Sequence, residues 1–313
     1  MSRLNSSIKV EACASMSNLG SGFDILGISI NVVSDEIIIE KREDKEIVIK
    51  EIFPLELNIP KEIEKNTCGF AVKQLLEKYQ VDCGIDITIY KKLGIGSGLG
   101  SSASSAVAGV FAANELFNLK IKKQELIYHA LEGEKIASKA IHADNVAPCL
   151  YGGVVLINSY NPLNVIALPY PEDLFFTLIY PDIEIKTSQA RSILPGEISF
   201  KDAVFQTGKT AGLISGFYQK DIQLISDSIQ DKLAEPYRKH LIPHYGEMKE
   251  IAFDNGAYAF NISGSGPTVF AVSDNISTAE LIGNKIQEYL YGKSIGSNSY
   301  ISSVNPNPPK VIG

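Results

Sequence analysis

Residues 94–104 have the composition of a loop that binds phosphate groups. The segment reads Gly94, Ile95, Gly96, Ser97, Gly98, Leu99, Gly100, Ser101, Ser102, Ala103 and Ser104. Glycine adopts positive φ angles and lets backbone N–H groups approach a ligand closely. A strand-like alternation over 84–90 precedes this glycine–serine loop, and a helical run of small residues, 103–117, follows it. Because the first N–H groups of a helix have no intrahelical partners, we expect the loop to bind an anion such as phosphate.

The same residues are also compatible with a plain glycine-rich turn whose serine caps the helix. Three familiar signatures are absent. The P-loop spelling fails at Thr207-Gly-Lys-Thr210, since Ala203 stands where its first glycine is required. The dinucleotide spelling G-x-G-x-x-G fails because Leu99 takes the place of its third glycine. The nucleophile elbow G-x-S-x-G fails at Ser97 and Ser265.

Two further glycine-rich elements lie before and after this loop in the sequence. Ser263-Gly-Ser-Gly-Pro-Thr268 joins two strand-like runs and is either a tight turn or a second N–H-rich bend. The segment 15–24 contains Asn18 and Asp24, separated by glycines. That pair has the groups to orient a hydroxyl and hold an ammonium, although Asn and Asp are also ordinary turn formers.

Composition limits the classes of function. The net charge is −7 with no block of Lys or Arg, so we expect neither nucleic acid nor an anionic membrane as a partner. No window approaches the roughly 18 apolar residues of a membrane span, and residues 1–7 lack the apolar stretch of a signal peptide, which favours a cytoplasmic protein. Four cysteines without C-x-x-C spacing are expected to be buried thiols; they are Cys13, Cys68, Cys83 and Cys149.

Periodicity predicts an α+β protein. Alternation indicates strands at 8–14, 28–33, 36–40, 46–50, 84–90, 153–157, 175–180, 258–262, 268–273 and 299–304. Helical spacing indicates helices at 67–78, 103–117, 122–140, 202–217, 221–232, 245–254 and 278–291. Helices interspersed among adjacent strands fit an α+β sandwich better than a doubly wound sheet. We expect residues 158–171 to connect two domains and residues 305–309 to be loose.

In order and spelling, the three glycine-rich elements resemble the three motifs of the GHMP kinases, the superfamily of galactokinase, homoserine, mevalonate and phosphomevalonate kinases. Two more blocks, His142-Ala-Asp-Asn-Val-Ala-Pro148 and Glu235-Pro-Tyr-Arg238, are similar to those of the homoserine kinase family. Together the blocks cover residues 15–268. The resemblance implies an N-terminal ATP-binding domain like ribosomal protein S5 (1–163) and a C-terminal ferredoxin-like α/β sandwich (164–313).

On the nucleotide side, the resemblance implies that the glycine–serine loop wraps the triphosphate of ATP. Ser102 and Glu134 match the family's magnesium-facing pair, and a hard cation between two phosphates does prefer a few oxygen ligands. Glu132 lies on another side of the same expected helix, so it cannot face the metal together with Glu134. A solvated helix carboxylate is the alternative for Glu134. Asn66 resembles the family's adenine-side position.

On the acceptor side, the resemblance implies that Asn18 and Asp24 hold the hydroxyl and amino groups of L-homoserine. Arg191 and Arg238 would bind its carboxylate, for which a guanidinium is suited. The other implied substrate-side residues are Thr187, His142, Asp144, Asn145 and Gly264. Thr187 shares one helix face with Arg191 if that segment is helical. Asp144 is either an amino-group ligand or structural, and His142 either contacts substrate or is structural.

The resemblance places Asn145 where some GHMP kinases have an aspartate base, and an amide accepts no proton. Transfer would then rest on positioning and charge neutralisation. Two positions depart from the family's pattern. Gly94 replaces the usual proline at the start of the loop, which should loosen its entry, and Ser104 replaces a common alanine.

The resemblance therefore implies an ATP- and Mg²⁺-dependent kinase that converts L-homoserine to O-phospho-L-homoserine for threonine biosynthesis, and we expect a homodimer. Two alternatives stay open: a GHMP kinase with a sugar, polyol or isoprenoid acceptor, and a non-catalytic sensor of the same fold. The first alternative is disfavoured because two arginines suited to a carboxylate, with an acid suited to an amine, indicate an amino-acid acceptor. The second is disfavoured because a non-catalytic sensor has no need of the magnesium-facing pair, Ser102 and Glu134.

Overall fold

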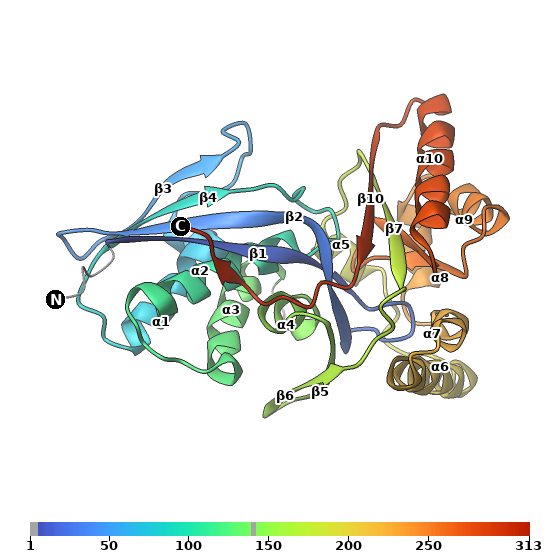
Figure 1. The fold of residues 1–313 in the computed structure, drawn as a ribbon, viewed down its shortest axis with the longest axis horizontal. Helices are drawn as coiled ribbons and strands as arrows, with labels where there is room; N and C mark the ends of the chain where they lie inside the picture. The colour runs from blue at the N-terminus through green and yellow to red at the C-terminus, as the bar shows by residue number, and fades with distance from the viewer. Residues whose placement is uncertain (1–5, 139–141) are drawn as a thin grey trace.

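A computed structural model describes residues 6–138 and 142–313 and arranges them as two β-sheets, each with its own helices (Figure 1). The strands are β1 (Ser7–Ser17), β2 (Leu26–Lys41), β3 (Ile47–Phe53), β4 (Ile85–Tyr90), β5 (Val154–Tyr160), β6 (Leu163–Leu168), β7 (Phe175–Pro181), β8 (Ala259–Ile262), β9 (Val269–Ser273), β10 (Ser297–Ser303) and β11 (Lys310–Val311). The α-helices are α1 (Thr67–Lys78), α2 (Ser101–Leu116), α3 (Lys123–Ser138), α4 (Ala143–Tyr151), α5 (Thr187–Ser192), α6 (Phe200–Gln219), α7 (Ile222–Ser228), α8 (Glu235–Arg238), α9 (Tyr245–Asp254) and α10 (Ile276–Gly292). Two short 3₁₀ turns cover Ile63–Lys65 and Lys239–Leu241.

The N-terminal sheet has the strand order β11-β1-β2-β4-β3, and the β5–β6 hairpin joins it through β2. Alternating Ile and Val side chains, such as Ile37, Ile39 and Ile87, are buried in one core with α1, α2, α3 and α4. The small side chains of α2 allow this helix to lie in the middle of that core, since Ala and Gly let neighbouring backbones approach. The glycine–serine loop thus ends on the most deeply packed helix of the domain.

Strand β2 corrects the prediction of two strands at 28–33 and 36–40. The intervening polar pair, Ser34 and Asp35, looked like a break in the sequence. Asp35 is fully buried inside the strand because its carboxylate accepts hydrogen bonds from the backbone N–H groups of Lys92 and Leu93. A buried carboxylate with such partners costs far less than an unpaired one, so the strand continues.

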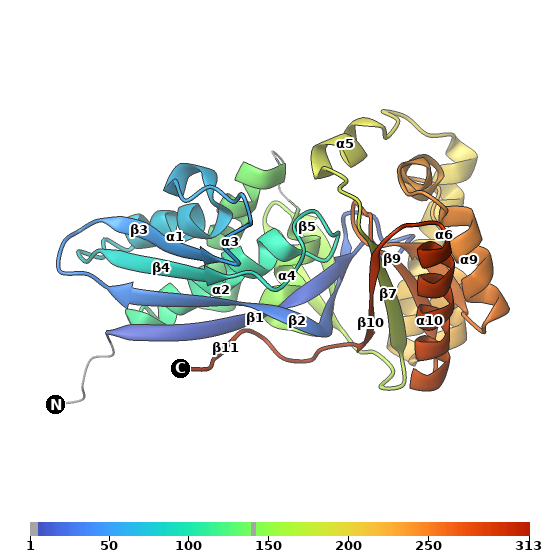
Figure 2. The ribbon, with the colours of Figure 1, turned by 90° about the horizontal axis from the view of Figure 1, so that it is seen from above.

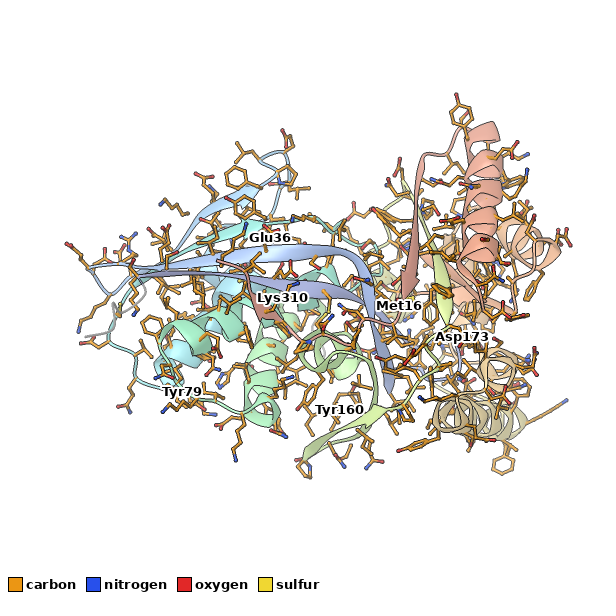
Figure 3. All side chains as sticks on the ribbon, viewed as in Figure 1. Met16, Glu36, Tyr79, Tyr160, Asp173 and Lys310 are labelled. Atoms are coloured by element: carbon orange, nitrogen blue, oxygen red, sulfur yellow. The ribbon has the colours of Figure 1, made fainter. Side chains whose placement is uncertain are left out.

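The C-terminal sheet is antiparallel, in the order β10-β7-β9-β8, and α9 and α10 cover one of its faces (Figure 2). The opposite face buries Leu178 and Phe270 in a core that also contains Leu213 and Phe217 of α6. Met16 of β1 belongs to that same core and lies where the two domains meet (Figure 3). The two domains therefore share apolar packing at their junction.

The predicted α+β fold is confirmed, and most predicted elements lie within a few residues of their observed bounds. The last two residues of the predicted helix 122–140 lie outside the described residues. Helix 221–232 ends earlier, at Ser228, where α7 stops and a loop begins. The expected connection at 158–171 instead contains the β5–β6 hairpin, whose strands pair through Val154 and Leu168. Sheet membership would put a domain boundary after Leu168, while the boundary between 163 and 164 stays a prediction.

Residues 305–309 are not loose. The carbonyl of Asn305 accepts a hydrogen bond from Gly153 N, and its own N–H donates to Ser29 O. Beyond them β11, which the sequence did not predict, pairs with β1. All four cysteines are free; three are buried and Cys83 is half-buried. Among the described helices, none has the length and apolar character needed to span a membrane.

Candidate active site

A cavity of about 430 Å³ lies between the two domains and brings most of the predicted site residues together. The predicted residues that line it are Asn18, Asp24, Asn66, Ile95, Gly96, Ser97, Gly98, Gly100, Ser101, Ser102, Glu134, His142, Asp144, Asn145, Thr187, Arg191, Arg238 and Gly264. Four residues of the predicted nucleotide site do not line it: Gly94, Leu99, Ala103 and Ser104. Leu99, Ala103 and Ser104 are buried in the protein interior, which limits them to holding the loop backbone.

The glycine–serine loop packs directly on the second glycine-rich element. Gly96, Gly98 and Gly100 all have positive φ angles, a conformation that side chains rarely adopt. A Cβ on Gly98 would lie 2.6 Å from the carbonyl oxygen of Ser263. Ser263 Oγ in turn donates to Gly98 O at 2.6 Å. Gly98 is therefore required for the two loops to meet at the cavity.

Helix α2 begins at Ser101 with Gly100 as its N-cap, and no side chain caps it. The alternative interpretation from the sequence, a turn whose serine caps the helix, is therefore wrong for this helix. A glycine cap leaves the N–H groups of the first turn available to a ligand. Because the positive end of the helix dipole also points there, the start of α2 suits a phosphate.

Ser102 and Glu134 are neighbours across α2 and α3, as predicted: Ser102 Oγ donates to Glu134 Oε2 at 3.1 Å. Burial raises the pKa of Glu134 to about 7, against the opposing effects of Ser102 and Lys91. Glu132 instead pairs with Lys135 at the surface, so only Glu134 faces the cavity. No cluster of three or more His, Cys, Asp or Glu suited to a metal occurs in the described ranges 6–138 and 142–313.

Asn145, near the start of α4, is fixed by two serines of β1. Its Oδ1 accepts a hydrogen bond from Ser15 Oγ at 2.9 Å, and its Nδ2 donates to Ser17 Oγ at 3.0 Å. Both functions of the amide are thus used, and the side chain lines the cavity in one orientation. An amide held in this way can position a neighbouring group but cannot take a proton.

The predicted acceptor side contains an ion pair between Asp24 and Arg191. Arg191 Nη1 and Nη2 each donate to Asp24 Oδ2 at 2.8 Å, and Nη2 also lies 2.7 Å from His142 Nε2. Burial lowers the pKa of His142, and the nearby arginines act in the same direction against Asp24. Thr187 stands one turn before Arg191 in α5 and lines the cavity too, which confirms the helical spacing.

Arg238 is a buried cation held by backbone carbonyls. Its side chain donates to Ala190 O at 3.0 Å and to Gly264 O at 2.7 Å, and the residue is 4% exposed. Burial, together with the positive charge of Arg191, lowers its pKa to about 10. Asn18 donates to the same carbonyl of Gly264 at 3.1 Å. A desolvated guanidinium of this kind favours an anionic ligand.

Asp144 is a buried carboxylate at the wall of the cavity. Its Oδ1 has no hydrogen-bond partner among the described residues. Burial, and then the charge of Asp24, raise its pKa to about 7. A carboxylate left in this state is suited to a cationic ligand, because a positive charge would offset its desolvation.

Asn66 lines the cavity, but its side chain already has a structural task. Its Oδ1 caps α1 by accepting from Gly69 N at 3.1 Å, and its Nδ2 donates to Pro60 O. Gly94 packs against Tyr180, whose ring would lie 2.8 Å from a Cβ added at 94. The ring fills the space a proline would need, which explains how the loop entry is closed without one.

Sequence reasoning missed a buried ion pair under the loop. Lys91 binds the carboxylate of Asp35, and it donates to Ser101 O at 2.8 Å and Ser105 Oγ at 2.9 Å. With three donors used, the ammonium ties β2, the loop and α2 together. The lysine was visible only as the end of a strand, and no pattern pointed to Asp35 as its partner.

Comparison with known proteins defines the class. The family models for the GHMP kinases N terminal domain and the GHMP kinases C terminal match residues 65–153 and 213–292. A crystal structure of L. major mevalonate kinase shares the fold at a TM-score of 0.74 with 16% identity, covering 97% of this chain and 98% of that one. With the two glycine-rich loops facing one cavity, the chain is a GHMP kinase.

Individual relatives of the chain identify the family within this class. Homoserine kinase of Chlorobaculum tepidum is 40% identical, over 96% of this chain and 97% of its own. Homoserine kinase of Methanococcus maripaludis is 37% identical, over 95% and 99%. The crystal structure of homoserine kinase from Cytophaga hutchinsonii matches with a TM-score of 0.96 and 43% identity, covering 100% of this chain and 99% of that one. The chain belongs to the homoserine kinase family.

Proposed function

We propose that the protein transfers the γ-phosphoryl group of ATP to the side-chain hydroxyl of L-homoserine, giving ADP and O-phospho-L-homoserine for threonine biosynthesis. The observation that carries this proposal is one cavity with two chemically distinct ends. One end has the start of α2 and the glycine–serine loop, and the other has Arg191, Arg238, Asp24 and Asp144. An amino acid carries the carboxylate and the ammonium that these side chains would pair with.

At the nucleotide end, the loop and the first turn of α2 would hold the phosphates through backbone N–H groups. Ser102 and Glu134 would hold Mg²⁺, and the two oxygen ligands fit a cation that takes its other ligands from phosphates and water. Bound there, the ion would neutralise charge on the phosphates. Asn66 would lie beside the adenine, as the family's pattern implies.

At the acceptor end, Arg191 and Arg238 would bind the carboxylate, while Asp24 and Asp144 would bind the ammonium. The ion pair between Asp24 and Arg191 has to open for this, and homoserine offers both partners with matching charges. The ion pair between Arg191 and Asp24 would thereby be replaced by two ion pairs with the substrate, one from each residue. His142, Thr187, Asn18 and Gly264 complete the wall on this side.

We assign no general base. Asn145 lies beside the loop, with its Oδ1 3.0 Å from the position of a Cβ added at Gly100. An amide is not basic, so Asn145 accepts no proton. Phosphoryl transfer requires mainly alignment of the hydroxyl oxygen with phosphorus and neutralisation of charge on the phosphate oxygens. Asn145, Ser102 and Glu134 would provide these without removing the proton beforehand.

The test is a coupled assay of ADP release with Mg²⁺ and ATP against homoserine, mevalonate, galactose and shikimate. We expect release only with homoserine. Release with another acceptor would favour a different GHMP kinase, and none with any acceptor would favour a sensor. A homodimer in the cytoplasm is inferred from the family alone, and sedimentation equilibrium tests the dimer.

A further inference from the structure

The hydroxyl of Tyr160 joins two segments of the acceptor end that are far apart in sequence. Tyr160 is the last residue of β5 and lies at the β5–β6 hairpin (Figure 3). Its Oη donates to the carbonyl oxygen of Asp24 at 2.8 Å. The same oxygen accepts a hydrogen bond from Ala143 N at 3.2 Å. The phenol thus uses its donor and its acceptor on two different segments.

Both segments carry acceptor-side residues, and each has a backbone feature that the Tyr160 hydroxyl supports. Asp24 has a φ of 60°, a left-handed conformation that a non-glycine residue holds only when its surroundings require it. Ala143 is the first residue of α4, the helix that carries Asp144 and Asn145, and its N-cap His142 makes no side-chain cap. The Ala143 N–H, left without an intrahelical partner, is satisfied by Tyr160 instead.

We propose that Tyr160 is a positioning residue that sets the separation of Asp24 from the start of α4, and through it the affinity for the amino-acid substrate. This inference rests on the proposed function. Tyr160 is not among the residues that line the cavity, so it acts through Asp24 and α4. Burial raises the pKa of its hydroxyl, which keeps the proton needed for donation.

A merely structural role would be to attach the hairpin to the domain. The hairpin has other attachments, because β5 pairs with β2 through Leu156, Val155 and Val154. Tyr128 of α3 also accepts a hydrogen bond from Leu163 N at 3.1 Å, at the start of β6. Tyr128 is 42% exposed and Tyr160 38%, and both hydroxyls bind backbone groups, so Tyr128 of α3 is a matched control for Tyr160 of β5.

The experiment compares Tyr160→Phe with Tyr128→Phe in steady-state kinetics, with KM for homoserine and for ATP measured separately. Tyr160→Phe removes two hydrogen bonds and keeps the ring. We expect the homoserine KM to rise about tenfold, because Asp24 and the start of α4 are no longer held at a fixed separation. The ATP KM should stay within about twofold, because the nucleotide end makes no contact with Tyr160. Tyr128→Phe should leave both values unchanged.

Three results would overturn the proposal: an unchanged homoserine KM in Tyr160→Phe, an equal rise for ATP, or the same rise in Tyr128→Phe. The melting temperature and the ATP dissociation constant of each variant show whether the fold is intact. Calorimetric titration with homoserine provides a second readout, in which the dissociation constant should rise as KM does. If the unaltered protein releases no ADP with homoserine, the proposed function fails first, and this inference with it.

Discussion

At the scale of single residues, the acceptor end is defined by charges that the fold leaves incompletely paired. Arg238 donates hydrogen bonds to two backbone carbonyls and lies over the ring of Phe23. Arg191 pairs with Asp24, which also lines the cavity. Folding removes Arg238 from water, with a cost that a bound carboxylate would offset. Such groups are functional candidates because burial without an opposite charge is otherwise selected against.

Replacing either arginine by alanine should weaken homoserine binding selectively. We expect Arg191→Ala or Arg238→Ala to raise the homoserine KM by about 30-fold or more, equivalent to about 2 kcal/mol for a charged hydrogen bond. The ATP KM should change far less. Arg42→Ala is the control, since Arg42 pairs with Asp44 and Asp86 and does not line the cavity. Unchanged homoserine KM values in both site variants would contradict the assignment.

Asp144 should make the stability of the free protein depend on pH. Its pKa of about 7 when folded exceeds the usual value of about 4, so the folded state binds the extra proton. Its favourable contribution is therefore complete below about pH 4 and is lost as the pH rises through 7. Asp144→Asn has no such dependence. Urea unfolding should show that this variant gains stability over the parent between pH 5 and pH 8.

This prediction would be contradicted if the difference in the free energy of unfolding between Asp144→Asn and the parent stayed constant from pH 5 to pH 8. Saturating homoserine should reduce the difference at pH 8, because an ammonium beside the carboxylate removes its desolvation penalty. Asp227→Asn, at the exposed end of α7, is a suitable control for a general charge effect.

At the scale of elements, the loop and α2 form a phosphate site only because two glycine-rich turns approach each other. Gly98→Ala would place a Cβ against Ser263 O at 2.6 Å and require a φ of 79°. We expect the ATP KM to rise by about five- to 150-fold, since strain of this kind costs about 1–3 kcal/mol. Homoserine binding in the absence of ATP, measured by calorimetry, should persist.

Gly208→Ala is the matched control for that variant, because Gly208 lies inside α6 with open space around it. Alanine there should leave the kinetics unchanged and raise stability by up to about 1 kcal/mol. An unaltered ATP KM in Gly98→Ala would mean that the two turns need not touch for the nucleotide to bind.

Local patterns predicted these elements well wherever one periodicity dominated. The helix 67–78 has its predicted bounds because Asn66 caps it and its apolar spacing is regular. The patterns failed where a long-range contact decides the structure. Asp35 keeps β2 continuous through backbone groups more than fifty residues away, and no local rule contains that information. Helix α4 was missed because Pro148 lies inside it.

At the scale of the whole molecule, the chain returns from the second domain to the first. Residues 305–313 run along the N-terminal domain, where Gly153, Ser29 and Lys9 form backbone hydrogen bonds with them (Figure 1). The sequence indicated a loose segment because Asn and Pro are frequent there. The partners that fix it belong to the first 153 residues, so composition alone could not reveal them.

Removing residues 305–313 should therefore lower stability while sparing the chemistry. The pairing of β11 with β1 is lost, and with it at least four further backbone hydrogen bonds, those of Asn305 with Ser29 and Gly153 and those of Lys9 with Ile312 and Gly313. At about 1 kcal/mol each, unfolding should become easier by a few kcal/mol. Neither KM should change at 25 °C, because the cavity is lined by other residues. Urea unfolding and steady-state kinetics check both parts.

A shorter truncation separates the two contributions. Removing only residues 310–313 deletes β11 but keeps the contacts of Asn305, so its effect should be smaller. It also exposes the edge of β1, and light scattering should detect the association that an unpaired edge strand promotes. Equal stability of all three proteins would show that the returning segment holds neither domain. A raised KM for both substrates would show instead that it sets how the two domains enclose the cavity.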